Sequence, residues 1–380
     1  MDLHELGPEW DAVVVGAGVA GATCALHLAR AGLRVVLVEK STWPRAKVCG
    51  GCVNAAALQM LAEAGIQLHE GAGYDRLRLG CRGRAATLAL PRGIAISRRR
   101  LDAILVEHAR GAGAQFLPAT GARLGSVTQA GRDVGLRQGT TERVVCARVV
   151  LDCGGLATRL ADDPGWRVAR HARIGVGATL PDAPAWYRAG VIHMACTAQG
   201  YVGLVRAEGD AANIAAALDP SWCAQAGGPA KAVRSILDAA GFPAPEDLHQ
   251  VRWRGTPRLT RTRAASGALP RVLALGDAMG YVEPFTGEGM AWALADAIAV
   301  QPFALEAVEQ WMDDITARWH ARHLGMLRMR KLACRGITTL LRHPRLLGAM
   351  LPLLEGAPAL TAPVTAWLNR GFRIPEAVNP

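Results

Sequence analysis

Three glycines near the start of the chain have a spacing that serves phosphate binding. They are Gly16, Gly18 and Gly21, and they follow the apolar run Ala12–Val15, which has the composition of a parallel strand buried on both faces. The first glycine permits a tight turn, the second lets a diphosphate approach the backbone, and the third lets the next helix pack on the strand. The spacing predicts a phosphate-binding turn, with a βαβ unit that binds no ligand as the alternative.

A carboxylate follows at a distance that suits a nucleoside. Ala22–Arg30 is rich in alanine and leucine, which predicts a helix, and Gly32 ends it. Arg34–Val38 is a second strand, and Glu39 lies at its carboxyl end. An acid about twenty residues after the glycines can bind the two hydroxyls of an adenosine ribose.

A second segment, far along the chain, also places an acid directly after a strand. Arg271–Leu275 is an apolar strand, and Asp277 follows it. A loop with Pro284 then leads to a helix that starts at Gly287–Gly289. The acid can accept a hydrogen bond from a sugar-like hydroxyl, and the helix start presents unpaired N–H groups to an anion. A turn followed by a core helix is the alternative.

Two cysteines lie in the glycine-containing loop after Glu39. Cys49 and Cys52 form the sequence C-G-G-C. Such a pair can be a redox dithiol or half of a zinc site, but the chain has no second C-x-x-C pair, so we predict no metal site. Three interpretations stay open: a pocket-shaping loop with inert thiols, a single functional cysteine at Cys49, or a redox dithiol.

A run of alternating residues predicts a sheet that covers a substrate cavity. Arg173–Leu218 alternates apolar and polar residues between glycines and prolines, which is typical of an antiparallel sheet with one covered face. His193, Tyr201 and Tyr187 lie on it. They are candidates for proton donation or substrate orientation, with a structural role as the alternative for each.

The elements that must position these residues form an α/β chain interrupted by that sheet. Leu124–Val127, Val134–Leu136 and Arg143–Val150 predict a β-meander, and the pattern after Met290 is helical. We expect a Rossmann-like dinucleotide-binding domain with an inserted antiparallel β-sheet substrate domain and a helical C-terminus. The predicted parts are 1–80 and 81–165 with the meander for the first domain, 166–255 for the sheet domain, 256–305 for the return to the first domain, and 306–380 for the helical region.

The composition narrows the classes of partner. The N-terminus is too short and polar for a signal peptide, no apolar run reaches about eighteen residues, and the nine cysteines are scattered, so we expect reduced thiols in the cytoplasm. The net charge is +11, but aromatic residues make up only 5% and no nucleic-acid motif appears. We therefore predict no nucleic-acid partner, and favour anionic cofactors, a negatively charged membrane face or an acidic carrier protein.

The segment Ala317–Met350 is both basic and apolar. Arginines interleave with leucine, methionine and isoleucine along it. This pattern leaves three interpretations: peripheral contact with anionic lipid at the inner membrane face, docking of an acidic acyl carrier protein, or a core-packing helix with a solvated arginine face.

Together these segments resemble the FAD-dependent oxidoreductases of the glutathione-reductase-like class. The resemblance is to the branch with geranylgeranyl reductases, aromatic hydroxylases and flavin-dependent halogenases, and it spans about three quarters of the chain. The matching pieces are GAGVAG at Gly16–Gly21 with Glu39, PRAKVCGG at Pro44–Gly51, SRRRLDAILVEHA at Ser97–Ala109, and GDAMGYVEPFTGEGMAWAL at Gly276–Leu294.

The resemblance implies a role in FAD binding for individual residues. It places Gly16, Gly18 and Gly21 at the diphosphate, Glu39 at the adenine ribose, Arg45 and Arg98 facing the cofactor, Asp277 at the ribityl or diphosphate part, and Pro284, Gly287, Glu288 and Gly289 along the isoalloxazine ring. The geranylgeranyl reductases also carry a cysteine near the flavin at the position of Cys49.

Two departures from the family bear on the reaction. Hydroxylases usually carry Ala-Asp-Gly where this chain has Asp152-Cys153-Gly154, so the aspartate attributed to nicotinamide contact is displaced or missing. The paired-tryptophan motif of tryptophan-type halogenases is absent, since Trp253 has no such partner. The resemblance therefore favours the reductase branch.

We expect an enzyme that binds FAD, takes hydride from NAD(P)H and acts on a bulky apolar substrate, leaning to C=C reduction. Because the chain has one nucleotide fingerprint, NAD(P)H would dock transiently in the substrate cleft. The first alternative is a monooxygenase that hydroxylates an aromatic or polyketide substrate through a C4a-hydroperoxyflavin. The second is a non-catalytic flavoprotein that holds FAD as a structural element.

Overall fold

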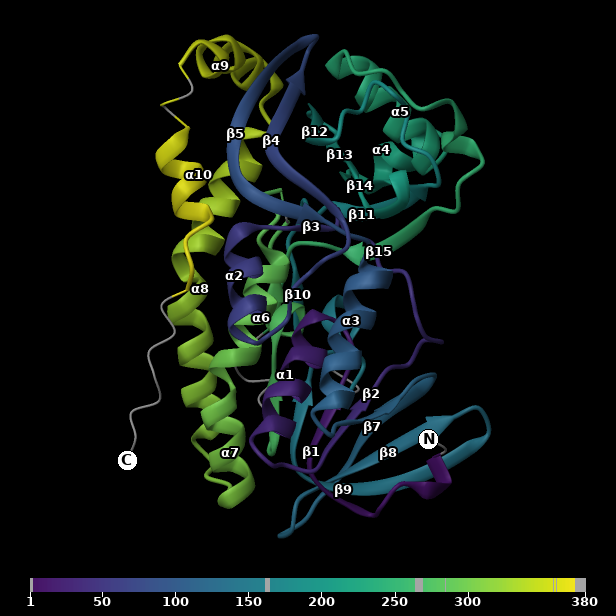
Figure 1. Cartoon of the computed structure of the whole chain (residues 1–380), viewed down its shortest axis with the longest axis vertical. Coiled ribbons are helices and arrows are strands. Elements are labelled where there is room, and N and C mark those ends of the chain that lie inside the picture. Colours follow the sequence, from purple (N-terminus) through teal and green to yellow (C-terminus); the bar gives the residue numbers. More distant parts are fainter. Residues whose placement is uncertain are drawn as a thin grey trace.

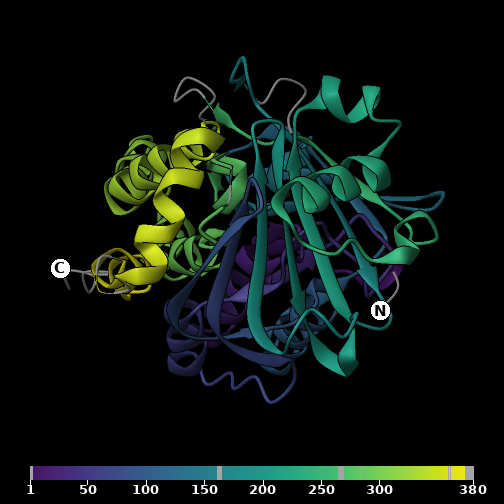
Figure 2. The ribbon, with the colours of Figure 1, turned by 90° about the horizontal axis from the view of Figure 1, so that it is seen from above.

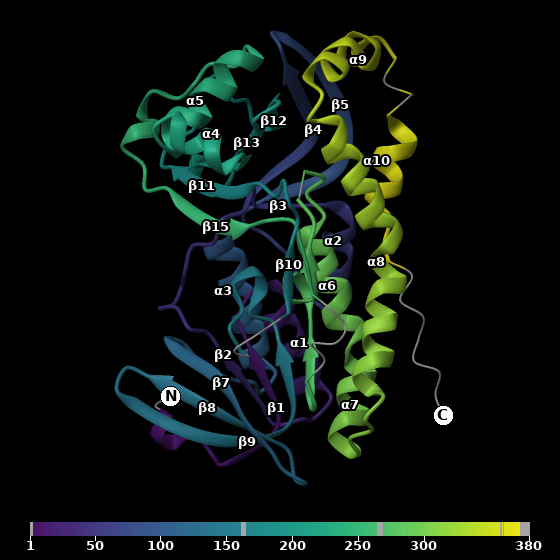
Figure 3. The ribbon, with the colours of Figure 1, turned by 180° about the vertical axis from the view of Figure 1, so that it is seen from behind.

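The described part of the protein contains two large β-sheets with their covering helices, a small three-stranded sheet and a group of C-terminal helices. The computed structural model describes residues 3–160, 165–263, 269–283, 285–357, 359 and 361–372. Figure 1 shows the first sheet in the lower half of the view, the second sheet in the upper half, and the C-terminal helices along one edge. Figure 3 shows the same arrangement from behind.

The first sheet has a parallel centre and an antiparallel extension. Its strands are β1 (Glu9–Val15), β2 (Val35–Val38), β6 (Gln115–Leu117), β7 (Thr120–Val127), β8 (Arg132–Gln138), β9 (Thr141–Asp152) and β17 (Val272–Ala274). Their order is β6-β2-β1-β9-β8-β7, and β17 pairs in parallel with the end of β9. The strands β7, β8 and β9 are antiparallel, which confirms the predicted meander.

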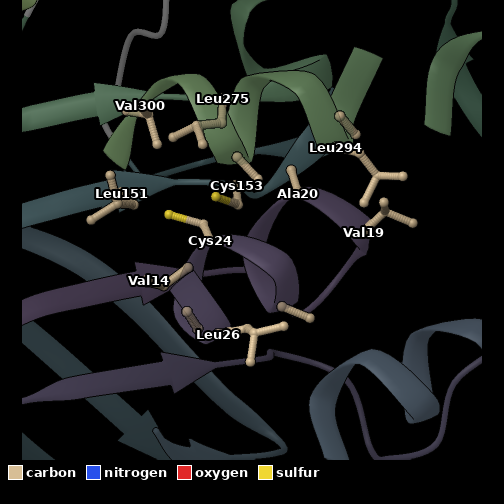
Figure 4. Close-up of a cluster of buried hydrophobic side chains, with 14 of the residues drawn as sticks. Val14, Val19, Ala20, Cys24, Leu26, Leu151, Cys153, Leu275, Leu294 and Val300 are labelled. Atoms are coloured by element: carbon tan, nitrogen blue, oxygen red, sulfur yellow. The ribbon is translucent and has the colours of Figure 1, made fainter. Parts of the chain in front are cut away.

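Four helices cover the parallel part of this sheet. They are α1 (Val19–Arg30), α2 (Ala55–Glu63), α3 (Arg98–Gly111) and α6 (Gly289–Ala299). The starts of α2 and α3 are capped by Asn54 Oδ1 and Ser97 Oγ, which accept backbone N–H groups of the first turn. Figure 4 shows the small side chains of Ala20, Cys24 and Cys153 between α1, β9 and α6. Their size lets these elements approach closely.

The third fingerprint glycine stands where α1 meets the turn after β1. A Cβ added at Gly21 would lie 1.8 Å from the carbonyl oxygen of Gly16 and 3.1 Å from the Cβ of Cys153. No side chain fits into that space. The close helix–strand packing expected from the sequence is therefore present.

The second sheet is mixed, and two helices cover its outer face. Its strands are β3 (Cys52–Val53), β4 (Ala72–Cys81), β5 (Arg84–Ala95), β11 (Ile174–Leu180), β12 (Gly190–Thr197), β13 (Gly200–Arg206), β14 (Ala212–Leu218) and β15 (Arg254–Arg258). The order is β15-β11-β14-β13-β12-β4-β5-β3, with β12 and β4 parallel and the other pairs antiparallel. The helix α5 (Pro229–Ala240), preceded by α4 (Pro220–Gln225), packs on one face, as Figure 2 shows from above.

The structure corrects the predicted domain boundaries. Residues 72–95 form β4 and β5 of the second sheet, although we predicted them in the dinucleotide domain. The turn of this hairpin is Arg82-Gly83, with positive φ at both residues. An arginine at a left-handed position is a weak turn signal, so the hairpin was not evident from the sequence.

The C-terminal region is helical, as predicted. It consists of α7 (Gln301–Glu309), α8 (Ile315–Leu340), α9 (Pro344–Gly356) and α10 (Ala362–Leu368). A third, small sheet has three strands, β10 (Trp166–Val168), β16 (Arg261–Arg263) and β18 (Gly280–Tyr281), in the order β10-β16-β18. Among the described residues, one stretch is long and apolar enough to cross a membrane. It is Gly289–Glu309, which comprises α6 and α7, and 67% of its most apolar eighteen residues are buried inside the protein, as in the core helices of a globular fold.

Gly21→Ala tests the packing of α1. The new methyl group must push α1 away from the turn at Gly16, so we expect the free energy of unfolding to fall by about 3 kcal/mol. Gly111→Ala is the control, because its Cβ meets nothing within 4 Å at the end of α3. Urea denaturation followed by circular dichroism measures both, and equal midpoints for the two variants would contradict the argument.

Candidate functional site

The start of α1 forms a cradle with two arginines in front of it. The N-cap residue is Gly18, and no side chain caps the unpaired N–H groups of the first turn. A Cβ on Gly18 would lie 3.4 Å from Nη2 of Arg98 and 3.6 Å from Nη2 of Arg45. Gly16 has φ +104° and approaches the carbonyl oxygen of Cys153 too closely for a side chain. Backbone N–H groups without covering side chains and two guanidinium groups therefore lie together around Gly18.

Glu39 lies beside this cradle at the end of β2. Its buried carboxylate accepts hydrogen bonds from Arg45 Nε at 2.9 Å, Ser41 N at 3.0 Å and Ala17 N at 3.3 Å. Burial by itself would raise the pKa of Glu39, but the charge of Arg45 and these donors outweigh it and lower the pKa below its usual range. The group is therefore a carboxylate at neutral pH.

A second carboxylate holds both arginines in place. Asp102 of α3 is fully buried and accepts from Arg98 Nε and Nη2 at 2.9 Å each and from Arg45 Nη1 at 2.8 Å. The two carboxylates and the two guanidinium groups thus form one network, in which Arg45 links Glu39 to Asp102 and Asp102 binds Arg98. Such fixed, charge-assisted contacts orient the guanidinium groups toward Gly18.

The cradle fits the diphosphate of FAD. An anion at Gly18 would meet the start of α1 and two positive charges, and the glycine leaves room for it. Glu39 lies where the sequence predicts a ribose partner, although its carboxylate is already engaged by Arg45. When FAD is bound, it supplies hydride-transfer chemistry to this groove.

The segment that follows β17 and carries Asp277 lies next to the start of α1. Gly276 has φ +57°, and a Cβ there would lie 3.4 Å from the Cβ of Ala20 on α1. Asp277 follows, with its carboxylate 3.8 Å from Nζ of Lys47. The Cβ positions of Gly287 and Gly289 meet nothing within 4 Å, so the start of α6 has free space beside it. The predicted residue Pro284 lies outside the described residues.

Glu288, predicted to line the isoalloxazine ring, has its carboxylate bound to another helix. Its Oε1 accepts from Nη1 of Arg330 at 2.6 Å, and its Oε2 accepts from the hydroxyl of Thr286 at 3.1 Å. The side chain is buried, and burial raises its pKa although Arg330 opposes the change. We infer that Glu288 fixes the start of α6.

The inner face of α8 holds the segment from Ala274 to Glu288, which the resemblance assigns to the flavin and which we name the flavin-facing segment, with its central part called the flavin-facing loop. Trp319 Nε1 donates to the carbonyl of Ala274 at 2.7 Å, and Cys334 Sγ lies 3.1 Å from the carbonyl oxygen of Glu283. Arg330 also donates to two carbonyls of the chain end and lies 4.2 Å from the ring centroid of Phe372. Sequence reasoning missed these residues, although Trp319, Arg330 and Cys334 are spaced by eleven and four positions, which places them on one face of a helix.

A buried Asp–His–Lys chain supports the turn that carries Asp277. Asp296 of α6 accepts the N–H of Gly276 at 2.8 Å and contacts His323 Nδ1 at 2.9 Å. The other ring nitrogen of His323 lies 3.0 Å from Nζ of Lys331, whose pKa is lowered by burial. The chain was not predicted, because Asp296 lies 27 residues before His323 and on another helix.

A cavity of about 300 Å³ opens between the loop with Cys49, the start of α3 and the second sheet. Its lining includes the apolar residues Val48, Ala178 and Ile214, with Asn213 beside them. Arg98, Arg99, Arg254, Lys47 and Glu208 are also among the lining residues. A hollow of about 420 Å³ elsewhere lies between α1 and α3, away from these groups.

The two cysteines of the C-G-G-C loop are free thiols. Cys49 is partly exposed, lines the cavity, and accepts the N–H of Gly51 at 3.4 Å. Burial, and to a lesser extent Cys49, raise the pKa of Cys52, so that thiol stays protonated. In the described ranges, no group of three or more His, Cys, Asp or Glu is placed to hold a metal ion. The geometry brings Cys49, and not Cys52, to the cavity.

The two other predicted catalytic residues lie on opposite faces of the second sheet. His193 packs under α5 with Trp186, Tyr187 and Phe242 at ring distances of 5.0 to 6.2 Å. The structure therefore does not bring His193 to the cavity. Tyr201 faces the other way and packs edge-on against Phe285 of the flavin-facing loop at 5.2 Å.

Tyr201 carries a buried hydroxyl without a hydrogen-bond partner among the described residues. Its pKa is raised well above the usual value by burial and by the nearby carboxylate of Glu283. A neutral phenol held beside the flavin-facing loop can give a proton or orient an oxygen of a substrate.

Arg330→Met tests the hold of α8 on the start of α6. The change leaves the buried Glu288 unpaired, so we expect the free energy of unfolding to fall by about 3 to 5 kcal/mol. The double variant Glu288→Gln with Arg330→Met removes both charges and should lose less than half as much. Urea denaturation of both proteins measures the difference, and an equal loss in both would contradict the pairing.

His193→Leu tests a contribution to acid sensitivity. Burial, then the charge of Arg78, lower the pKa of His193 from 6.5 to about 4. The unfolded chain therefore binds this proton more tightly, and stability falls as the pH drops from about 6.5 to 4, by roughly 2 to 3 kcal/mol. The variant should lose that part of the pH dependence in urea titrations at pH 7 and pH 4.5. If the variant shows the same difference in the free energy of unfolding between pH 7 and pH 4.5 as the unchanged protein, His193 is ruled out as the source.

Comparison with known proteins agrees with this arrangement. The FAD binding domain family matches residues 9–310. YdiS of Escherichia coli (strain K12), named a probable electron transfer flavoprotein-quinone oxidoreductase, is 31% identical over 185 residues, which cover 44% of this chain and 42% of YdiS. The chain thus matches less than half of the length of this curated relative.

Solved structures share the fold at low sequence identity. A geranylgeranyl bacteriochlorophyll reductase-like protein (Ta0516) from Thermoplasma acidophilum has a TM-score of 0.74 at 17% identity, covering 95% of this chain and 95% of that chain. PqsL of Pseudomonas aeruginosa, described as a probable FAD-dependent monooxygenase, has a TM-score of 0.66 at 21% identity, covering 90% of this chain and 99% of that chain. The predicted fold class and family are confirmed. The chain belongs to the FAD binding domain family.

Proposed function

We propose that this flavoprotein uses NAD(P)H to reduce a C=C bond of a bulky apolar substrate. The observation that carries the proposal is the cavity beside Cys49, whose lining combines apolar residues of the loop and sheet with basic groups. Gly177 lines it as well, and a Cβ there would lie 3.2 Å from Cγ1 of Val48. An isoprenoid or polyketide chain suits such a cavity, free or bound to a carrier protein.

The surroundings of Asp152 bear on how a nicotinamide would contact this strand end. Its carboxylate is fully buried and is bound by Arg263 Nη1 at 3.1 Å, Thr158 Oγ1 at 2.8 Å and the N–H of Gly154 at 3.2 Å. An aspartate engaged in this way is not free to contact a nicotinamide. This agrees with the sequence, in which Asp152-Cys153-Gly154 stands where hydroxylases usually carry Ala-Asp-Gly.

Reduction of a C=C bond adds a hydride to one carbon and a proton to the other. Tyr201 is the group that we assign to the proton, because its hydroxyl is neutral, buried and adjacent to the flavin-facing loop. Cys49 is the second candidate, since its thiol lines the cavity. NAD(P)H is expected to dock transiently in the cleft, and the cytoplasm is the proposed compartment.

A monooxygenase is the second candidate function. The fold similarity to PqsL supports this second candidate, whereas the fold similarity to the reductase-like Ta0516 supports the first. Fold similarity at these identities does not separate the two reactions. A non-catalytic flavoprotein is the third reading, and it predicts no reduction by either nicotinamide.

Turnover with and without oxygen separates these functions. We expect NADPH or NADH to bleach the flavin absorbance of the purified holoenzyme under argon. Geranylgeraniol, as a probe, should then gain two mass units per turnover without oxygen. A product heavier by sixteen mass units, with one O₂ consumed per NAD(P)H, would assign the monooxygenase. A flavin that neither nicotinamide reduces would assign the structural flavoprotein.

A further inference from the structure

The helix α8 has two faces with different tasks. Its inner face carries Trp319, His323, Arg330 and Cys334, which bind the flavin-facing segment as described above. Its outer face carries other residues, which take no part in those contacts. The outer face therefore needs an explanation of its own.

The outer face is defined by five exposed residues, which we name the α8 stripe. At 100° per residue they fall within an arc of about 140° on the helix. They are Leu324, Arg328, Met329, Leu332 and Arg335. The exposed fractions of Leu324, Met329 and Leu332 are 46%, 65% and 47%. Methionine and leucine side chains this open to solvent on one helix face indicate a surface that is covered in use.

Exposed apolar side chains concentrate on the C-terminal helices. Among the described residues, eleven large apolar side chains are exposed, and six of them lie on α8, α9 and α10. Besides the stripe these are Leu346 and Leu353 of α9 and Val364 of α10. Figure 2 shows these helices together on one side of the molecule.

The charge of α8 identifies the kind of partner. The helix has six arginine or lysine residues and no aspartate or glutamate. Within the part of the chain that the structure describes, Arg328 and Arg335 form no ion pair. The whole chain carries a net charge of +11, so a second copy would be repelled from this face. An anionic partner is required.

We propose that the α8 stripe docks the protein onto an anionic lipid bilayer. The arginines attract the negative headgroups, and the leucines and methionine enter the boundary between headgroups and acyl chains. A bilayer also suits the interleaving of apolar and basic residues, because long arginine side chains extend to the headgroups while their stems stay in apolar surroundings. The inner face of the same helix then holds the flavin segment close to the membrane surface.

Vesicle co-sedimentation of the FAD-loaded protein tests the proposal. We expect binding to vesicles of phosphatidylcholine with phosphatidylglycerol, weak binding to phosphatidylcholine alone, and loss of binding as salt rises. Arg328→Gln with Arg335→Gln should weaken binding about fivefold for each arginine. Leu324→Ser, Met329→Ser and Leu332→Ser together should weaken it further. Arg137→Gln with Val144→Ser, at exposed positions of β8 and β9, is the matched control and should bind like the unchanged protein.

Several outcomes would overturn the proposal. One is equal binding of the stripe variants and the unchanged protein, and another is binding that ignores lipid charge and salt. A stripe-dependent dimer in light scattering would assign the face to a second copy. A stripe-dependent complex with a purified acyl carrier protein, without vesicle binding, would assign it to an acidic protein. Flavin absorbance of each variant shows that the fold is intact.

Discussion

The close contact between the start of α1 and the turn at Gly276 is the constraint on which the site depends. Two segments separated by more than 250 residues must meet without large side chains between them, which is why alanine and glycine lie at Ala20 and Gly276. The approach aligns the N–H groups of α1 with the acid at Asp277. The start of α1 and Asp277 both follow the carboxyl ends of parallel strands, β1 and β17, and this is the edge of such a sheet where ligands bind.

Buried charge is used in this protein to fix loops, and each charge is balanced. Glu39 and Asp102 orient Arg45 and Arg98, Asp296 orients the Gly276 turn through its N–H, and Glu288 binds Arg330. Buried pairs add little net stability compared with apolar packing, but they allow few geometries. The helix α8 thus serves as a brace for the segment between Ala274 and Glu288.

The second sheet divides its two faces between stability and chemistry. The face with His193 packs against α5 and forms an apolar and aromatic cluster. The other face carries Tyr201 toward the flavin-facing loop, and at the edge strands it borders the cavity beside Cys49. Alternation along a strand sends neighbouring residues to different faces, so one sheet closes the active site and supports a separate core.

The sequence by itself determined the parts that depend on local pattern. Glycine spacing and apolar runs predicted β1, α1, the meander and β11 to β14, because period and turn chemistry are local properties. The tertiary structure decided the rest. Glu288 contacts Arg330 rather than open space, His193 lies under α5, and residues 72–95 join the second sheet. Each depends on which distant element packs against it, and for His193 both faces of β12 are apolar, so the pattern alone does not choose between them.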